Sequence, residues 1–304
     1  MIKKTLYFGS PAYLYKENEQ LTIKKPDQNE TNNSNGHINS IPIEDIGIII
    51  LDHGQITITH GLLSSLIENN CAVITCNNKH HPTGLFLNLD SNNTQTEKFQ
   101  YQINATVPLK KQLWKQTITA KINNQASLLK KKNKPIKNML YWAKKVRSGD
   151  PDNLEARAAL YYWQQLFPEQ LEFIREREGN PPNQLLNYGY AILRAVVARS
   201  LVASGLLPTL GIHHHNKYNS YCLADDIMEP YRPFVDEIVC EIVENGEDFY
   251  ELNKSVKEQL LTIPTIDIII ENKRSPLMIG VQRTTSSLAK CFSGELRKIL
   301  YPKL

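Results

Sequence analysis

The sequence predicts an α+β protein in which a β-sandwich-like N-terminal domain is followed by an all-α domain. Two patterns lead to this prediction. Residues 1 to about 90 form short alternating or apolar runs separated by Gly, Pro and Asn, whereas later residues carry apolar side chains at helical spacing. A polar stretch, DSNNTQT, lies between them at residues 90–96. We therefore expect domains at residues 1–90 and 101–304, joined by a linker at residues 91–100.

The composition is that of an ordinary globular protein, with 304 residues, 41% hydrophobic and 22% charged side chains, and a net charge of +4. The most apolar long segment, residues 189–212, contains Arg194 and Arg199, which indicates a buried helix and not a membrane span. The opening residues lack the apolar run of a signal peptide. Five scattered cysteines without CxxC spacing are typical of reduced thiols. We expect a cytoplasmic protein with no membrane partner.

The N-terminal domain is expected to contain several short strands and one helix. KTLYFG, AYLYKE and QLTIKK are predicted strands, DQNETNNSNGH is a predicted mobile loop, and IGIIIL is a predicted buried strand. GLLSSLIENN predicts a short helix capped by Thr59, after which CAVITC and GLFLNL return to β structure. The histidines of this half have no carboxylate at useful spacing, so we expect them to be structural or exposed. They are His53, His60, His80 and His81.

A basic, helical region follows the linker. No acidic residue lies between Glu97 and Asp150, although the same interval is rich in lysine. A solvated basic face is one interpretation. We favour contact with nucleic acid, because a long uncompensated block of positive charge is stabilised by phosphate and releases counterions. Such contacts read little sequence. The predicted DNA-binding residues are Lys110, Lys111, Lys130, Lys131, Lys132, Lys144, Lys145 and Arg147.

A carboxylate lies near the start of the next predicted helix, GDPDNLEARAALYYWQQLF. Asp152 or Asn153 can cap this helix, which places Glu155 on the same face as Ala158 and Tyr162. A carboxylate on an apolar face is costly to bury unless a cation pairs with it, so Glu155 is a candidate metal ligand. The alternative is a capping box, in which Glu155 bonds back to the backbone near Asp152.

The richest stretch for chemistry is LGIHHHNKYNSYCLADDIMEPYRP, residues 210–233. It follows a long apolar helix that is expected to begin near Pro181 or Pro182 and to end at Gly205. Its candidate ligands are His213, His214, His215, Asp225, Asp226 and Glu229. Carboxylate oxygens favour hard divalent cations, and one imidazole shifts the preference towards manganese. Asp226 and Glu229 share a face if the backbone is helical, but Pro230 disfavours that conformation at Glu229.

Each candidate in this stretch also has a purely structural interpretation: a helix cap for the aspartates and exposed surface for the histidines. Together with Glu155, a three-ligand metal site is the better hypothesis. Farther along, RPFVDEIVCEIVENG predicts an amphipathic helix, and IDIIIEN with SPLMIGVQ predicts a hairpin or buried connectors. A final helix is expected to add Lys290, Arg297 and Lys298 to the basic surface.

The order of NLEARAALYYW, NQLLNYGYAILRA, LPTLGIHHHN, LADDIMEPYRPFVD and TTSSLAKCF resembles the CRISPR-associated adaptation integrases, in the branch found in type II systems. The resemblance covers essentially the whole chain. The family uses a glutamate in an Ex(A/G)A-type helix, a histidine closing GxxH and an acidic residue closing Dxx(D/E). This implies catalytic roles for Glu155, His214, Asp226 and Glu229. Glu155, His214 and Glu229 would hold Mn²⁺ or Mg²⁺, while Asp226 binds or orients; which of Asp226 and Glu229 is the direct ligand stays open.

The resemblance also implies an activity and partners. The activity is that of a metal-dependent DNA integrase/endonuclease, in which a DNA 3′-hydroxyl attacks a phosphodiester at a CRISPR repeat and inserts prespacer DNA. The expected partners are double-stranded DNA, a second copy of the chain, and a small ferredoxin-like protein, the second-numbered Cas protein, in a heterohexamer. Type II effector and accessory adaptation proteins are further expected partners. The N-terminal domain would serve dimerisation and partner contacts.

Two other functions are compatible with the same residues. One is a standalone metal-dependent nuclease that acts on branched DNA. The other is a DNA-binding assembly module without catalysis, in which the acidic residues are helix caps. The joint presence of Glu155, His214, Asp226 and Glu229 argues against the second, since a degenerate site would tolerate the loss of one of them.

Overall fold

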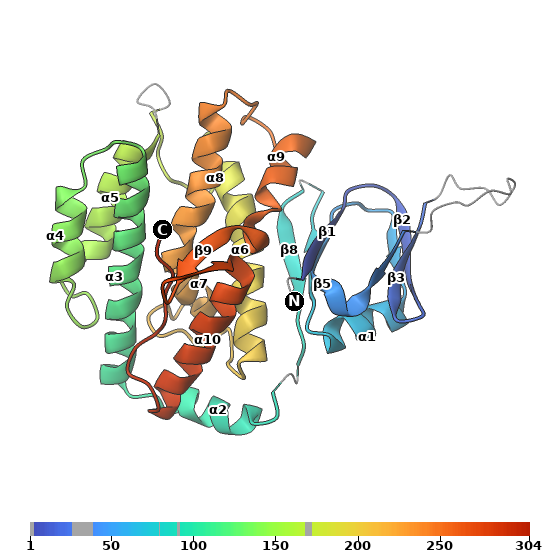
Figure 1. The fold of residues 1–304 in the computed structure, drawn as a ribbon, viewed down its shortest axis with the longest axis horizontal. Coiled ribbons are helices and arrows are strands. Elements are labelled where there is room, and N and C mark those ends of the chain that lie inside the picture. The colour runs from blue at the N-terminus through green and yellow to red at the C-terminus, as the bar shows by residue number, and fades with distance from the viewer. Residues whose placement is uncertain (1–2, 26–38, 79, 90–91, 168–171) are drawn as a thin grey trace, which may run out of the picture. The chain divides into compact units, whose positions relative to one another are not determined.

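The computed structural model describes residues 3–25, 39–78, 80–89, 92–167 and 172–304 (Figure 1). The chain divides into two compact units, Met1–Ser91 and Asn92–Leu304. Strands build the first unit and helices dominate the second, which confirms the predicted α+β class. The predicted Asn-rich loop, residues 27–37, lies outside the described residues.

Among its described residues, the first unit contains two four-stranded sheets and one α-helix. One sheet has the order β1-β5-β7-β8, with β1 (Lys4–Phe8), β5 (Ile46–Leu51), β7 (Ala72–Cys76) and β8 (Pro82–Phe86). The other has the order β4-β3-β2-β6, with β4 (Asn39–Pro42), β3 (Gln20–Lys24), β2 (Ala12–Glu17) and β6 (Ile56–Ile58). A short 3-10 turn, η1 (Ile43–Asp45), precedes β5. The IGIIIL run is apolar throughout because β5 is a central strand, flanked in parallel by β1 and β7.

The helix of this unit, α1 (His60–Glu68), begins where the sequence predicts. The Thr59 side chain accepts a hydrogen bond from the backbone N–H of Leu62, which confirms the predicted cap. Leu62 and Leu66 of α1 pack into a core with Leu14 and Leu21 from the strands. The unit is thus held by ordinary apolar burial between its sheets and helix.

The second unit consists mainly of helices. They are α2 (Gln95–Ile103), α3 (Val107–Lys131), α4 (Lys137–Lys145), α5 (Leu154–Leu166), α6 (Asn183–Ala203), α7 (Cys222–Met228), α8 (Arg232–Glu244), α9 (Lys254–Leu260) and α10 (Leu277–Ser293). The described part of the unit also contains the 3-10 turns η3 (Glu229–Tyr231) and η4 (Ile263–Thr265) and a hairpin of β9 (Asp267–Ile270) with β10 (Lys273–Pro276). The unit is therefore not purely helical, because IDIIIEN forms one arm of a hairpin. The prediction for SPLMIGVQ is wrong beyond Pro276, since the second arm is Lys273–Pro276 and Leu277 begins α10.

The apolar helix α6 forms the centre of this unit. It packs against α7, α8 and α10, and most of its side chains are buried. Gly189 permits the close approach of α8, since a Cβ atom there would lie 2.5 Å from Cγ1 of Val235. On the other side, α3 packs against α4, α5 and η3 (Figure 1). This packing brings α3, α5 and η3 together, and these elements carry the candidate site.

Two segments differ from the expected boundaries. Residues 95–100 of the expected linker form the first turns of α2, and Gln102 bonds to the carbonyls of Leu207 and Leu210. α10 ends at Ser293 because Gly294 adopts a φ of +85°. Arg297 and Lys298 therefore follow the helix instead of belonging to it. Within the described residues, no helix is both long and apolar enough to cross a membrane.

Candidate active site

Glu155 enters the site from the first turn of α5. Asn153 adopts a left-handed conformation with φ of 49°, and the Asp150 carboxylate accepts the backbone N–H groups of Leu154 at 3.0 Å and of Glu155 at 2.9 Å. Asp152 instead pairs with Arg147. The capping-box interpretation of Glu155 is therefore wrong, because Asp150 does the capping. The Glu155 carboxylate is left for another partner.

Glu229 enters from η3, which continues α7 into α8. Its backbone is helical, with φ of −51° and ψ of −46°, although Pro230 follows it. The carboxylate is buried between two cations. Arg232 Nε donates to Oε1 at 2.8 Å, and Lys121 Nζ lies 2.6 Å from Oε2. Burial opposes ionisation of Glu229, but Arg232 and Lys121 together outweigh it and lower the pKa to about 2. Glu229 is therefore a carboxylate at neutral pH.

Lys121 joins the two glutamates. Its ammonium lies 2.7 Å from Oε1 of Glu155, so one buried cation bridges carboxylates from α5 and η3. The opposing carboxylates outweigh the burial that would otherwise lower the pKa of Lys121, and they raise it. The sequence does not reveal this role, because Lys121 lies in the lysine-rich interval between Glu97 and Asp150. The spacing along the helix could have indicated that Lys121 is buried. Lys121 lies seven residues after Trp114 and seven before Leu128, so the three share one helix face, and all three are buried.

Asp226 organises the turn that carries the histidines. Its fully buried carboxylate accepts the backbone N–H groups of Ile212 at 2.7 Å, His213 at 2.9 Å and His214 at 3.3 Å. Gly211 is required here, since a Cβ atom would lie 2.3 Å from the His214 carbonyl oxygen and 2.8 Å from Oδ2 of Asp226. The Asp226 carboxylate therefore holds together the backbone of the turn from Ile212 to His214.

His214 is held by the same carboxylate. Its Nδ1 lies 2.5 Å from Oδ1 of Asp226, and this hydrogen bond raises the pKa of His214 although partial burial opposes the rise. A carboxylate bound to Nδ1 fixes the ring and leaves Nε2 for a ligand. The neighbouring His213 stacks on Trp114, with ring centroids 4.1 Å apart, and burial lowers its pKa. His215 is exposed.

The donor set fits a hard divalent cation. Glu155 and Glu229 supply oxygen atoms and His214 supplies nitrogen, which is the ligand chemistry of Mn²⁺ or Mg²⁺. The contact of Lys121 with Glu229 Oε2 lacks hydrogen-bond geometry, so this buried oxygen accepts no hydrogen bond from the described residues. Among those residues, no three His, Cys, Asp or Glu side chains converge closely enough to hold a metal ion. The two carboxylates meet across an ammonium instead.

The predicted DNA-binding residues fall into two groups. Lys131 pairs with Glu237, Lys132 with Glu244, and Arg147 with Asp152. The counter-charges of Lys131 and Lys132 come from α8, more than a hundred residues later in the chain. The other five make no ion pair with any residue that the structure describes. They are Lys110, Lys111, Lys130, Lys144 and Lys145.

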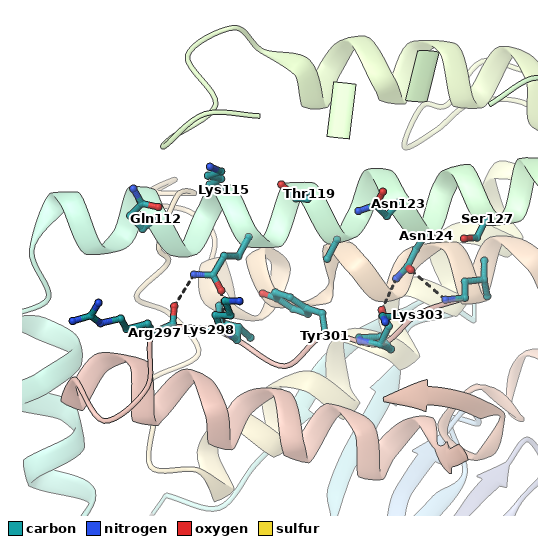
Figure 2. A pocket seen from close by; sticks show the side chains of 15 residues that line it. Gln112, Lys115, Thr119, Asn123, Asn124, Ser127, Arg297, Lys298, Tyr301 and Lys303 are labelled. Atoms are coloured by element: carbon teal, nitrogen blue, oxygen red, sulfur yellow. Dashed lines mark hydrogen bonds between the residues drawn. The ribbon is translucent and has the colours of Figure 1, made fainter. Parts of the chain in front are cut away.

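A groove of about 800 Å³ runs between α3 and the segment after α10 (Figure 2). Figure 2 shows Lys115, Thr119 and Asn123 along α3, opposite the C-terminal segment. Its lining contains no Asp or Glu side chain, while its cations are Lys115, Arg297, Lys298 and Lys303. The groove does not include Glu155, His214 or Glu229, which lie elsewhere in the same unit.

One histidine of the first unit has a carboxylate partner after all. His80 Nδ1 lies 2.8 Å from the buried Oδ1 of Asp52, and the Tyr7 hydroxyl donates to Oδ2 of the same residue at 2.5 Å. The His80 side chain is 55% exposed, in agreement with the expectation of a structural or exposed residue. The sequence did not reveal this pair because its members are 28 residues apart.

Comparisons with known proteins relate the chain to a family. The sequence model described as "CRISPR associated protein Cas1" matches residues 6–270. The chain is 38% identical over 255 residues to the CRISPR-associated endonuclease Cas1 of Neisseria meningitidis serogroup C (strain 8013), covering 83% of each protein.

Two solved structures share the fold. One is a casposase bound to integration product, with a TM-score of 0.77 and 20% identity, covering 98% of this chain and 92% of that chain. The other is a chain of a Cas6-RT-Cas1–Cas2 complex, with a TM-score of 0.73 and 20% identity, covering 97% of this chain and 35% of that chain.

Proposed function

The chain belongs to the CRISPR-associated Cas1 family, and from this premise we propose that it is a metal-dependent DNA integrase/endonuclease of CRISPR adaptation. In the proposed reaction a prespacer 3′-hydroxyl attacks a phosphodiester at the edge of a CRISPR repeat. One P–O bond forms and one breaks, so the joining needs no nucleotide cofactor. The hydroxyl proton leaves to solvent, and the departing DNA oxygen takes up a proton.

The observation that carries this proposal is the meeting of Glu155 and Glu229 across one cation, beside a histidine whose ring is fixed by Asp226. Carboxylates that share a buried cation are ready to bind a divalent ion. Their separate origins on α5 and η3 argue against the interpretation of both as helix caps. The endonuclease name of the relative that is 38% identical supports the same conclusion.

Each residue has a proposed role. Glu155, His214 and Glu229 would hold Mn²⁺ or Mg²⁺, and the bound ion would neutralise charge that develops on phosphate oxygens during the attack. Asp226 orients His214 through Nδ1 and keeps Nε2 directed away from itself. Arg232 holds Glu229 through Oε1 and keeps its carboxylate ionised. We assign the direct contact to Glu229 and the orienting role to Asp226, because Asp226 is saturated by hydrogen bonds.

We propose that DNA is contacted by the cations that make no ion pair with a described residue. Lys144 and Lys145 lie with Arg157 around a pocket beside Tyr141 and Trp142. The groove in Figure 2 offers further cations and amide side chains without a lining Asp or Glu side chain. Phosphate contacts of this kind position a duplex prespacer or repeat without reading its bases.

Partners are also part of the proposal. A fold shared with a chain of a Cas6-RT-Cas1–Cas2 complex supports a Cas2 partner. We further propose a homodimer, formed through the N-terminal unit and bridged by Cas2 into a heterohexamer. Type II effector and accessory adaptation proteins remain proposed partners.

The test is a strand-joining assay. Purified protein with Cas2, a labelled duplex and a repeat-containing plasmid should yield joined product with Mn²⁺ or Mg²⁺ and none with EDTA. Glu155→Gln and His214→Ala should abolish joining while retaining DNA binding. Joining at the wild-type rate in either variant would overturn the site. Cleavage of branched DNA without joining would instead favour the standalone nuclease, and EDTA-insensitive behaviour would favour the assembly module.

A further inference from the structure

The cation that bridges Glu155 and Glu229 belongs to the protein itself. Lys121 Nζ lies 2.7 Å from Glu155 Oε1 and 2.6 Å from Glu229 Oε2, and the lysine is 8% exposed. Both carboxylates lie at side-chain exposures of 25% or less. Two carboxylates that contact the same ammonium lie close enough to repel each other in a poorly solvated site, unless positive charge lies between them. The structure meets that requirement with an ammonium.

The second glutamate already has another cation. Arg232 Nε donates to Oε1 of Glu229 at 2.8 Å, so Glu229 does not depend on Lys121 alone for charge balance. Lys121 contacts the opposite oxygen, Oε2, together with Glu155. Those two oxygens are the atoms that share the ammonium. Lys121 therefore takes the bridging position, while Arg232 takes a flanking one.

The bridging position is also the one that a divalent ion requires. A metal ion bound by both glutamates needs oxygen contacts of roughly 2.1 Å, shorter than the distances to Nζ, and carries positive charge that the ammonium repels. Both cations cannot use Glu155 Oε1 and Glu229 Oε2 together. A lysine side chain has four rotatable carbon–carbon bonds and can leave without moving α3.

We propose that Lys121 is a built-in counter-cation, which occupies the bridging position until a divalent metal ion displaces it. This inference rests on the proposed function, because it concerns metal binding at the same site. Its consequence is a metal affinity reduced by competition with the ammonium. In return, the two carboxylates stay close together when no metal is bound.

The test compares substitutions at Lys121 by Mn²⁺ binding, measured from the loss of the free-ion electron paramagnetic resonance signal. Lys121→Met keeps the apolar stem and removes the charge, so its Mn²⁺ affinity should rise about tenfold or more, equivalent to one competing ion pair. Lys121→Arg keeps the charge in a fork that suits two carboxylates and should weaken binding by a similar factor. Lys254→Met on α9, which removes an exposed pair with Glu258, should change nothing.

A second readout uses thermal unfolding. In EDTA, Lys121→Met should unfold at a lower temperature than wild type, because Glu155 and Glu229 then face each other without a bridging cation. Saturating Mn²⁺ should remove most of that difference. If Lys121→Met does not fold without metal, the Lys121→Arg affinity decides.

The outcomes separate this inference from the proposed function. Equal or weaker Mn²⁺ binding by folded Lys121→Met, or unchanged binding by Lys121→Arg, overturns the displacement while wild-type joining stands. Wild-type Mn²⁺ binding without DNA joining overturns the function and leaves the displacement supported if the affinity order holds. No Mn²⁺ binding by wild-type protein at millimolar concentration overturns both.

Discussion

Two buried carboxylates of the second unit, Glu229 and Asp236, lie two helical turns apart and behave in opposite ways. Glu229 contacts Lys121 and Arg232, and its pKa falls to about 2. Asp236 accepts hydrogen bonds from the hydroxyl groups of Tyr162 at 2.7 Å and Tyr190 at 2.5 Å. Burial raises the pKa of Asp236 to about 6, because the tyrosines and more distant arginines offset it only in part.

The difference teaches what makes a carboxylate available for a cation. Both residues are acidic and almost fully buried, so burial alone does not distinguish them. Two cations keep Glu229 ionised, and one of them, Lys121, also pairs with Glu155. Asp236 is kept in place by neutral donors and belongs to the packing between α5, α6 and α8. The same helix α5 serves both, since Tyr162 lies two turns after Glu155.

The largest expected effect is a difference in strand-joining activity between substitutions at Glu229 and at Asp236. Glu229→Gln should lower strand joining by about a hundredfold or more, because it removes the charge of a proposed metal ligand. Asp236→Asn keeps a side chain of similar size in a position that contacts no candidate ligand, so joining should stay within about threefold of wild type once the fold is intact. The comparison fails if Asp236→Asn loses as much activity as Glu229→Gln.

A second test uses two adjacent buried aspartates, Asp226 and Asp225. Asp226→Asn should weaken Mn²⁺ binding by about ten- to a hundredfold, because it disturbs the hydrogen bonds that fix His214. Asp225 bonds to Arg194 and Asn219 instead, so Asp225→Asn should leave Mn²⁺ affinity unchanged. Titrations of both variants by electron paramagnetic resonance measure this. Equal losses in the two would mean that Asp226 has no specific role in orienting the histidine.

A third test uses the pH dependence of stability. Folding raises the pKa of Asp236 from 3.8 to about 6, so its contribution is most favourable below pH 3.8 and is lost as pH rises through 6. The change is on the order of 3 kcal/mol. Glu229 has the opposite sign, and its contribution is lost as pH falls from 4.5 towards 2.

Urea denaturation of wild type and Asp236→Asn between pH 4 and pH 7 isolates the Asp236 contribution. The unfolding free energy of wild type, relative to the variant, should decrease as pH rises across this interval. A relative stability that does not change with pH would show that Asp236 titrates near its usual pKa.

The smallest expected effect is on the affinity for duplex DNA and its salt dependence. It compares Lys144 and Lys145, which make no ion pair with a described residue, with Lys131 and Lys132, which do. Replacing Lys144 and Lys145 by Ala should weaken duplex binding several-fold and reduce the slope of log affinity against log salt by about 2, one for each lost phosphate contact. Replacing Lys131 and Lys132 should change the slope less, because Glu237 and Glu244 already neutralise them. Equal slopes for the two double variants would contradict this division.

Local signals explain what could be predicted from the sequence. The apolar run of β5, the Thr59 cap and the long helix α6 each depend on neighbouring residues, and the structure contains all three. The cap of α5 was harder to predict, because a left-handed Asn153 moves the capping role from Asp152 to Asp150.

The candidate site shows where local patterns stop being informative. Motif spacing selected Glu155, His214, Asp226 and Glu229, but it did not indicate which of Asp226 and Glu229 would contact the metal directly. The proposed assignment of these two roles depends on Arg232, which bonds to Glu229, and on the backbone N–H groups that a turn brings to Asp226. Lys121 was not predicted because it is 34 residues from Glu155 in the chain and pairs with it only through helix packing.

The most direct test of the account is Mn²⁺ titration of wild-type protein and Glu155→Gln, followed by electron paramagnetic resonance. We predict one Mn²⁺ ion per wild-type chain and an affinity that falls by about a hundredfold when the Glu155 charge is removed. Unchanged affinity and stoichiometry in folded Glu155→Gln would contradict a shared metal site between α5 and η3.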